Sequence, residues 1–161
     1  MTEDHQALKY SFDTSAIIDG LERYYPEDSF PAFWSRVDEL IEENRLLVSE
    51  EVWEEVKDYD KPAKDWLEGR RDSVLVPTDD VVAGDVKAIL GQYPLMVKVF
   101  KNRNRADPFV IAVARLREAV VVTGEGDDGN EKRPKIPFVC QQLGLQCIKL
   151  IDVVRQEHWQ F

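Results

Sequence analysis

Four acidic side chains occupy positions that suit a shared metal site. Asp13 directly follows a short apolar segment, Asp107 precedes an apolar run, Glu125 follows a β-branched run, and Glu55 lies in an acidic stretch. Clustered carboxylates repel one another unless a cation lies among them or one takes up a proton. Oxygen-only ligands suit Mg²⁺ or Mn²⁺, which also bind phosphate oxygens. The acids therefore predict a Mg²⁺ or Mn²⁺ site able to act on a phosphodiester.

Histidine and cysteine chemistry is largely excluded by the scarcity of these residues. The two histidines, His5 and His158, lie near the termini, where order is usually poorest. A Ser-His-Asp triad or a His-rich zinc site is therefore not expected. Cys140 and Cys147 are the only cysteines, too few for an all-cysteine zinc site, and we interpret them as buried free thiols.

Helical geometry selects one acid from the run between Glu50 and Asp58. With Val52, Val56 and Tyr59 on the buried side, Glu55 lies about 60° from the direction of Val52. Glu55 is thus expected at the edge of the core, where it can point into a cleft. On the same arithmetic Glu51 is the second choice, at about 100°, and Glu54 faces solvent.

Each acid also has an ordinary structural interpretation. Asp107 before Pro108 suits a helix N-cap, which we favour over a ligand role when the residue is considered alone. Asp13 can be a plain turn residue, and the acidic run a solvated helix face. The fourth acid of the site is left open among Glu125, Asp127 and Asp128.

Strands and helices alternate along the chain. Strands are expected over 8–12, 45–49, 73–77, 119–123 and 146–151. Helices are expected from a Ser15 cap through Leu21, over 30–44, after residue 49, and over 79–92, 107–117 and 136–143. This order predicts an α/β fold: a three-layer α/β/α sandwich around a mostly parallel sheet of about five strands. The functional crevice of such a sheet lies beyond the carboxyl ends of the strands.

The chain, 161 residues with a net charge of −10, fits one domain over 1–161. Residues 1–80 hold 9 basic and 22 acidic side chains, whereas residues 81–161 hold 12 basic and 9 acidic ones. The densest basic stretch contains Lys101, Arg103 and Arg105, which can bind phosphates or form a solvated loop. No apolar run approaches the roughly 20 residues of a membrane span, so we expect a cytoplasmic protein.

Four segments resemble the motifs of PIN-domain nucleases, in particular toxins of the VapC type. Phe12–Ser15 is similar to the Asp and small hydroxyl residue after the family's first strand, and Val48–Val56 to its glutamate-bearing helix. Ala106–Ala112 is similar to the Asp that begins an apolar helix, and Val121–Glu125 to the end of the fourth strand. The resemblance covers about residues 8–151 and is greatest to a bacterial single-domain branch of the superfamily.

The resemblance implies a PIN-like fold and a Mg²⁺- or Mn²⁺-dependent endoribonuclease. The implied ligands are Asp13, Glu55, Asp107 and an acid from the loop that holds Glu125 and Asp127. Glu125 stands where the family usually has Asp. Ser15 is expected to orient a ligand or a metal-bound water, while Lys101, Arg103 and Arg105 bind neighbouring phosphates. The implied partners are RNA, a cognate antitoxin protein and a second copy of the chain, with no membrane.

Two other functions remain open from the sequence. A PIN-like fold that no longer cleaves RNA can serve as a binding module, and the substitution of Glu125 for Asp gives this alternative some support. A Mg²⁺-dependent phosphatase of the haloacid-dehalogenase type also has an Asp after its first strand. That chemistry needs a second Asp two residues later, where this chain has Ser15.

Overall fold

Five parallel strands form one sheet in the computed structural model, which describes residues 7–59, 62–97 and 105–161. The sheet order is β3-β2-β1-β4-β5, so β1 lies at the centre. The strands are β1 (Tyr10–Phe12), β2 (Leu46–Ser49), β3 (Leu75–Val76), β4 (Val120–Val122) and β5 (Cys147–Ile148). The register pairs Phe12 with Val122, so the residues after β1 and β4 emerge side by side.

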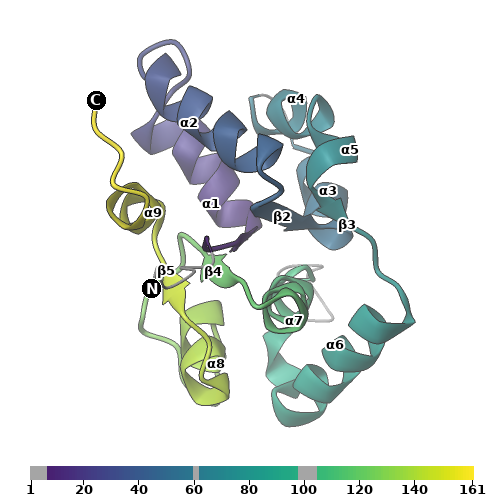
Figure 1. Cartoon of the computed structure of the whole chain (residues 1–161). Coiled ribbons are helices and arrows are strands. Elements are labelled where there is room, and N and C mark those ends of the chain that lie inside the picture. Colours follow the sequence, from purple (N-terminus) through teal and green to yellow (C-terminus); the bar gives the residue numbers. More distant parts are fainter. Residues whose placement is uncertain (1–6, 60–61, 98–104) are drawn as a thin grey trace, which may run out of the picture.

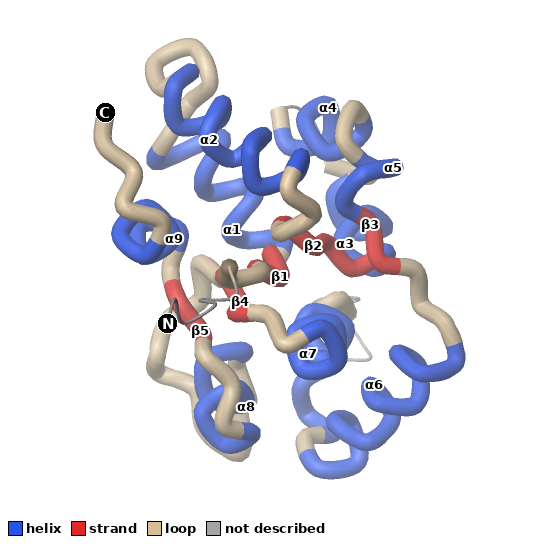
Figure 2. Tube along the Cα trace, in the orientation of Figure 1, coloured by secondary structure: helices blue, strands red, loops and turns tan. Residues whose placement is uncertain are grey.

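Helices cover both faces of this sheet, with α1, α2 and α9 on one side and α6, α7 and α8 on the other (Figures 1 and 2). The α-helices are α1 (Thr14–Asp19), α2 (Pro31–Glu42), α3 (Glu50–Val56), α4 (Ala63–Glu68), α5 (Arg71–Val74), α6 (Asp80–Gln92), α7 (Asp107–Arg117), α8 (Ile136–Leu143) and α9 (Leu150–Gln156). Two further helical segments are described, the π-helix η1 (Gly20–Tyr24) and the 3₁₀ helix η2 (Pro94–Met96). The predicted three-layer α/β/α class is confirmed.

Burial explains why the central strands are apolar on both faces. Every residue of β1 and β4 is buried, as expected for parallel strands that are covered by helices on each side. Helix α7 crosses directly beneath them, and almost all of its residues from Asp107 to Ala114 are buried. The Ser11 hydroxyl within β1 donates a 2.9 Å hydrogen bond to the Val110 carbonyl, which satisfies a polar group between the layers.

Several local predictions differ from the structure. Helix α1 is capped by Asp13, whose carboxylate accepts from the Thr14 amide, and not by Ser15, because the helix begins two residues earlier than expected. Helix α3 ends at Val56, so Tyr59 lies in the following turn and is 51% exposed rather than part of the buried stripe. Cys140 is buried as expected, but Cys147 is only half-buried.

The C-terminal helix α9 was not expected, and it begins where strand β5 was predicted to continue. Side chains from two distant segments fix its end. Glu157 Oε2 accepts hydrogen bonds from Tyr10 Oη at 2.5 Å and from Arg45 Nη2 at 2.6 Å. The end of α9 is thereby joined to the first two strands at their amino ends.

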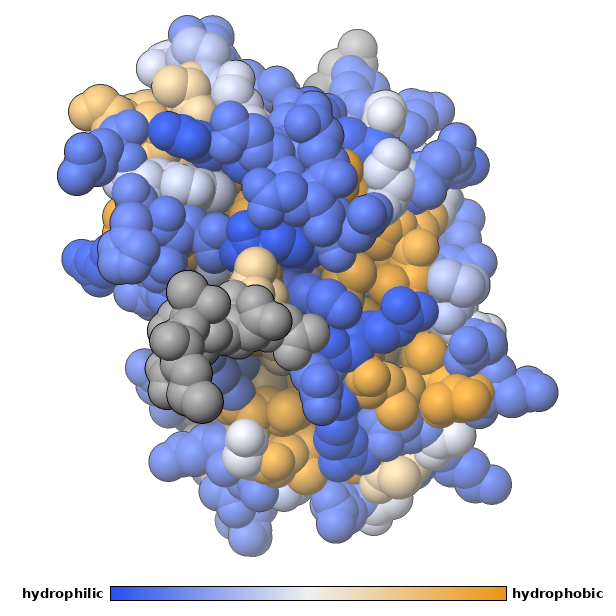
Figure 3. Space-filling view, in the orientation of Figure 1, coloured by the Kyte–Doolittle hydropathy of each residue, from blue (hydrophilic) through white to orange (hydrophobic). Residues whose placement is uncertain are grey.

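Hydrophilic side chains cover most of the face shown in Figure 3, with apolar patches between them. Within the described ranges, no helix is long and apolar enough to cross a membrane.

Candidate metal centre

Two of the predicted acids emerge from neighbouring strands at the same edge of the sheet. Asp13 follows β1 and Glu125 lies three residues beyond the end of β4. The Asp13 amide continues the ladder with a 2.9 Å hydrogen bond to the Val122 carbonyl. The parallel pairing of β1 and β4 therefore brings together residues that are 112 positions apart in the chain.

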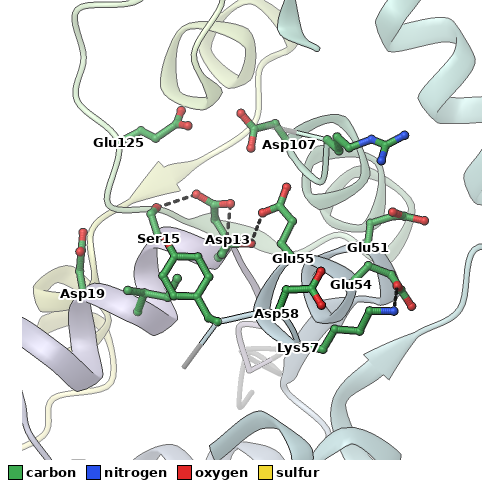
Figure 4. A pocket seen from close by; sticks show the side chains of 14 residues that line it. Asp13, Ser15, Asp19, Glu51, Glu54, Glu55, Lys57, Asp58, Asp107 and Glu125 are labelled. Atoms are coloured by element: carbon green, nitrogen blue, oxygen red, sulfur yellow. Dashed lines mark hydrogen bonds and ion pairs between the residues drawn. The ribbon is translucent and has the colours of Figure 1, made fainter. Parts of the chain in front are cut away.

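Asp107 completes a three-carboxylate cluster with Asp13 and Glu125. One carboxylate oxygen from each residue lies within 4.8 Å of the other two. In Figure 4 the Glu125 and Asp107 carboxyls point toward each other, with Asp13 below them. Asp13 is 2% exposed and Asp107 5% exposed, whereas Glu125 is half-buried.

Hydroxyl groups hold the Asp13 carboxylate in place. Its Oδ2 accepts from Ser15 Oγ at 2.7 Å and from Thr123 Oγ1 at 2.8 Å, while Oδ1 accepts from the Thr14 amide at 2.8 Å. Ser15 Oγ in turn accepts from the Gly124 amide at 2.9 Å. The carboxylate orientation is thus set by donors from both sides of the β1–β4 pair.

Asp107 does not act as the N-cap that the sequence favoured. The cap position of α7 is Ala106, and the Asp107 side chain makes no capping hydrogen bond from the first helical position. The Ala106 amide instead donates a 2.9 Å hydrogen bond to Glu55 Oε1. The Asp107 carboxyl is therefore left to face the other acids of the cluster.

Burial and the neighbouring carboxylates raise the pKa of both aspartates. Burial is the main cause of the rise of the Asp13 pKa from 3.8 to about 6, and the Glu125 charge adds to it, although the hydrogen bonds from Ser15 and Thr123 oppose the rise. The pKa of Asp107 is raised well above its ordinary value by burial and by the charges of Asp13, Glu125 and Glu55. These carboxyls therefore hold protons where isolated ones would not.

Glu55 borders the three-carboxylate cluster, as the helical geometry of α3 predicted. Its Oε2 accepts from Thr14 Oγ1 at 2.7 Å, and its Oε1 accepts from the Ala106 amide. Both oxygens are thus tied to the segments that carry Asp13 and Asp107. Glu54 is exposed, as expected, and forms an ion pair with Lys57.

The structure brings Glu125, rather than the two aspartates that follow it, to the cluster. Glu125 Oε2 accepts a 2.8 Å hydrogen bond from the Ile136 amide at the start of α8. Asp127 is exposed and does not line the pocket described below. Asp128 is exposed too and pairs with Lys135 at 2.7 Å.

A cavity of about 750 Å³ opens over the cluster, and we call it the acidic pocket. Eight carboxylates and two basic side chains are among its lining residues, which are Asp13, Thr14, Ser15, Ile18, Asp19, Glu51, Glu54, Glu55, Lys57, Asp58, Tyr59, Arg105, Asp107 and Glu125. The pKa of Glu51 is raised by partial burial and by Glu54 and Glu50, whereas Arg105 lowers it. Arg105 thus lies on the pocket wall, as predicted, while Lys101 and Arg103 lie outside the described residues.

Two threonines that the sequence did not single out support the site. Thr123 holds Asp13 and also accepts from the Glu125 amide at 3.1 Å, and Thr14 holds Glu55. Thr123 directly follows strand β4, and Thr14 directly follows Asp13. Hydroxyl residues at these two positions are the sequence signal that could have identified them.

The fold and the three-carboxylate cluster define a parallel α/β protein whose acidic residues could hold a metal ion. Residues 10–161 match the family described as Domain of unknown function (DUF4411), and the chain belongs to that family. Among curated proteins, none matches the chain.

Proposed function

We propose that this protein is a Mg²⁺- or Mn²⁺-dependent endoribonuclease related to the PIN-domain nucleases. The observation that carries the proposal is the three-carboxylate cluster, in which Asp13 and Glu125 from the carboxyl ends of two adjacent parallel strands meet Asp107 from the start of α7. The parallel α/β fold, and the presence of Asp13, Glu55, Asp107 and Glu125 in the lining of one pocket, support the resemblance found in the sequence.

The donor set fits a hard divalent cation. All three side chains offer carboxylate oxygens as ligands. Oxygen donors without histidine or cysteine favour Mg²⁺ or Mn²⁺ over zinc. When bound, such an ion lowers the pKa of a coordinated water and offsets the charge that develops on a phosphodiester.

The remaining side chains have positioning roles in this proposal. Ser15 and Thr123 fix the oxygen of Asp13 that they both contact. Glu55, through the Ala106 amide, fixes the start of α7 and therefore the place of Asp107. Arg105 supplies a positive charge on the pocket wall for a phosphate of the RNA.

The phosphatase alternative is less well supported. That chemistry needs a second aspartate two residues after the first, which here would be Asp13. The residue two positions later is Ser15, and it holds Asp13 instead of supplying a second carboxylate. This contact suits a ligand held in one orientation.

A role as the toxin of a toxin–antitoxin pair extends the proposal and adds two partners, an antitoxin protein and a second copy of the chain. A small DNA-binding protein encoded directly upstream would support this role. Co-expression of the two proteins, followed by purification of their complex, tests it.

Cleavage of RNA tests the nuclease proposal. The wild-type protein should cleave RNA with Mn²⁺ or Mg²⁺ and lose activity with a chelator, and Asp107→Asn should be inactive. Asp128→Asn is the matched control, because Asp128 is an exposed acid in the same loop as Glu125 and is paired with Lys135. Equal cleavage by the wild type, Asp107→Asn and Asp128→Asn would refute the proposal. If the wild type binds a partner protein tightly but cleaves no RNA, the silent binding module is favoured.

A further inference from the structure

A second cavity adjoins the acidic pocket on the side of α1 and α9. Its volume is about 310 Å³, and we call it the tyrosine pocket. It is lined by Ala16, Asp19, Gly20, Tyr24, Tyr25, Thr123, Gly124, Lys149, Leu150 and Ile151. Asp19 lines both cavities, and Figure 1 shows α1 and α9 on the same face of the sheet.

The two cavities are separated by a thin wall. Thr123, which donates to Asp13 at 2.8 Å, also lines the tyrosine pocket. The Gly124 amide donates to Ser15, and a Cβ added at Gly124 would lie 2.7 Å from Asp19 Oδ2. Only the side chain of Thr123 would thus separate a ligand in the tyrosine pocket from Asp13 of the three-carboxylate cluster.

The chemistry of the tyrosine pocket differs from that of its neighbour. Tyr24 is 59% exposed, which leaves its ring available to a ligand, and Leu150 and Ile151 supply an apolar floor. Its one carboxylate, Asp19, lies 3.8 Å from Arg23 in an ion pair. Lys149 adds a positive charge, so this cavity lacks the excess of acid that marks the acidic pocket.

Specific contacts shape the walls of the tyrosine pocket. The helix widens at η1, where the Tyr25 amide bonds to the Gly20 carbonyl at 2.8 Å, a π-type turn of the kind frequent at functional sites. The Tyr25 ring stacks on Phe33 with centroids 4.2 Å apart. A Cβ at Gly20 would lie 2.8 Å from Leu150 Cδ2, so glycine allows α9 to approach this closely.

We propose that the tyrosine pocket binds an unpaired base of RNA next to the phosphate held at the metal centre. The inference rests on the proposed nuclease function and names the form of its substrate. Exposed aromatic rings stack on bases of any sequence, and lysine binds the neighbouring phosphate. A base inside a duplex is stacked on both sides and cannot enter such a cavity, so the substrate is single-stranded.

Binding of a non-cleavable RNA tests this proposal without relying on activity. The probe is a fluorescein-labelled hexanucleotide of 2′-O-methyl RNA, titrated with the full chain in the presence of chelator and followed by fluorescence polarisation. Tyr24→Ala should weaken binding about tenfold, and Tyr24→Phe should leave it within about twofold, because the stacking ring is retained. Lys149→Gln should weaken binding about threefold. It should also lower by about one the number of ions released on binding, which is measured as the slope of log affinity against log salt concentration.

Lys87→Gln is the matched control, because Lys87 is an exposed lysine of α6 on the opposite side of the sheet (Figure 1). An NMR titration locates the bound base. The backbone amide resonances of Gly124 and Ile151 should shift on addition of uridine or adenosine monophosphate. Undetectable binding, or affinity unchanged in both Tyr24→Ala and Lys149→Gln, overturns the proposal.

The outcomes separate this proposal from the nuclease proposal. Binding at the tyrosine pocket without cleavage of any RNA supports the base site and refutes the nuclease. Metal-dependent cleavage with KM and affinity unchanged in Tyr24→Ala and Lys149→Gln refutes the base site and supports the nuclease. A duplex that binds as tightly as the single strand also overturns the base site.

Discussion

Replacing Asp13 with asparagine measures the cost of keeping a charge inside the three-carboxylate cluster. Burial and the Glu125 charge raise the Asp13 pKa from 3.8 to about 6 in the folded protein. Between these two pH values the unfolded chain has released its proton while the folded protein retains it, so stability falls as the pH rises. The resulting loss in the free energy of unfolding is complete above the pKa of Asp13 in the folded protein and amounts to about 3 kcal/mol.

Asp13→Asn has no such ionisation. The free energy of unfolding of Asp13→Asn, relative to wild type, should therefore rise by about 3 kcal/mol between about pH 4 and pH 7. Urea unfolding with chelator present measures it, followed by fluorescence because Trp34 and Trp66 are buried. The substitution also weakens hydrogen bonds to residue 13. This loss changes the free energy of unfolding of Asp13→Asn by the same amount at every pH, so it does not alter the dependence on pH.

The control for this experiment is Asp128→Asn. Lys135 holds the pKa of the exposed Asp128 below its ordinary value of 3.8, so the stability from this ionisation is almost fully present above about pH 4 and is lost as the pH falls below it. The relative stability of Asp128→Asn should thus change little between pH 4 and pH 7. A difference between Asp13→Asn and wild type that stays constant from pH 4 to pH 7 would refute the reasoning.

Two further substitutions test the supporting contacts. Thr123→Val removes a hydroxyl donor to Asp13, which favours the protonated acid, so calorimetry at neutral pH should show Mn²⁺ affinity about tenfold lower, whereas Thr123→Ser should keep it. Unchanged affinity in Thr123→Val would show that the hydroxyl has no part in positioning the ligand. Glu157→Ala removes the acceptor shared by Tyr10 and Arg45 and should lower the free energy of unfolding by about 2 kcal/mol in urea titrations. A loss below about 0.5 kcal/mol would mean that α9 is held by its apolar contacts alone.

The fold was predictable because its signals are local and repeated. The apolar face of α2, with Phe33, Val37, Leu40 and Ile41, follows helical spacing, and all four residues are buried. The continuous β-branched run of β4 indicated a strand covered on both faces, which the structure confirms. The position of Glu55 also followed from helical geometry alone, since Val52 and Val56 fix the orientation of α3.

The parts of the site that escaped prediction depend on contacts between distant segments. Thr123 meets Asp13 only because β1 and β4 are neighbours in a register that no single segment encodes. Asp107 was interpreted as a cap because Asp-Pro is common at helix starts, but Glu55 from another helix takes the Ala106 amide. The tyrosine pocket could not be foreseen, because it needs α9 against Gly20.

Mn²⁺ binding followed by calorimetry tests the central claim most directly, which is that Asp13, Asp107 and Glu125 together hold a divalent cation. Wild-type protein should bind Mn²⁺ and release protons, since the pKa of Asp13 and of Asp107 is raised in the metal-free protein. Asp107→Asn should lose this binding while Asp128→Asn retains it. Equal Mn²⁺ binding by Asp107→Asn and the wild type, or none by the wild type at millimolar concentrations, would contradict the account.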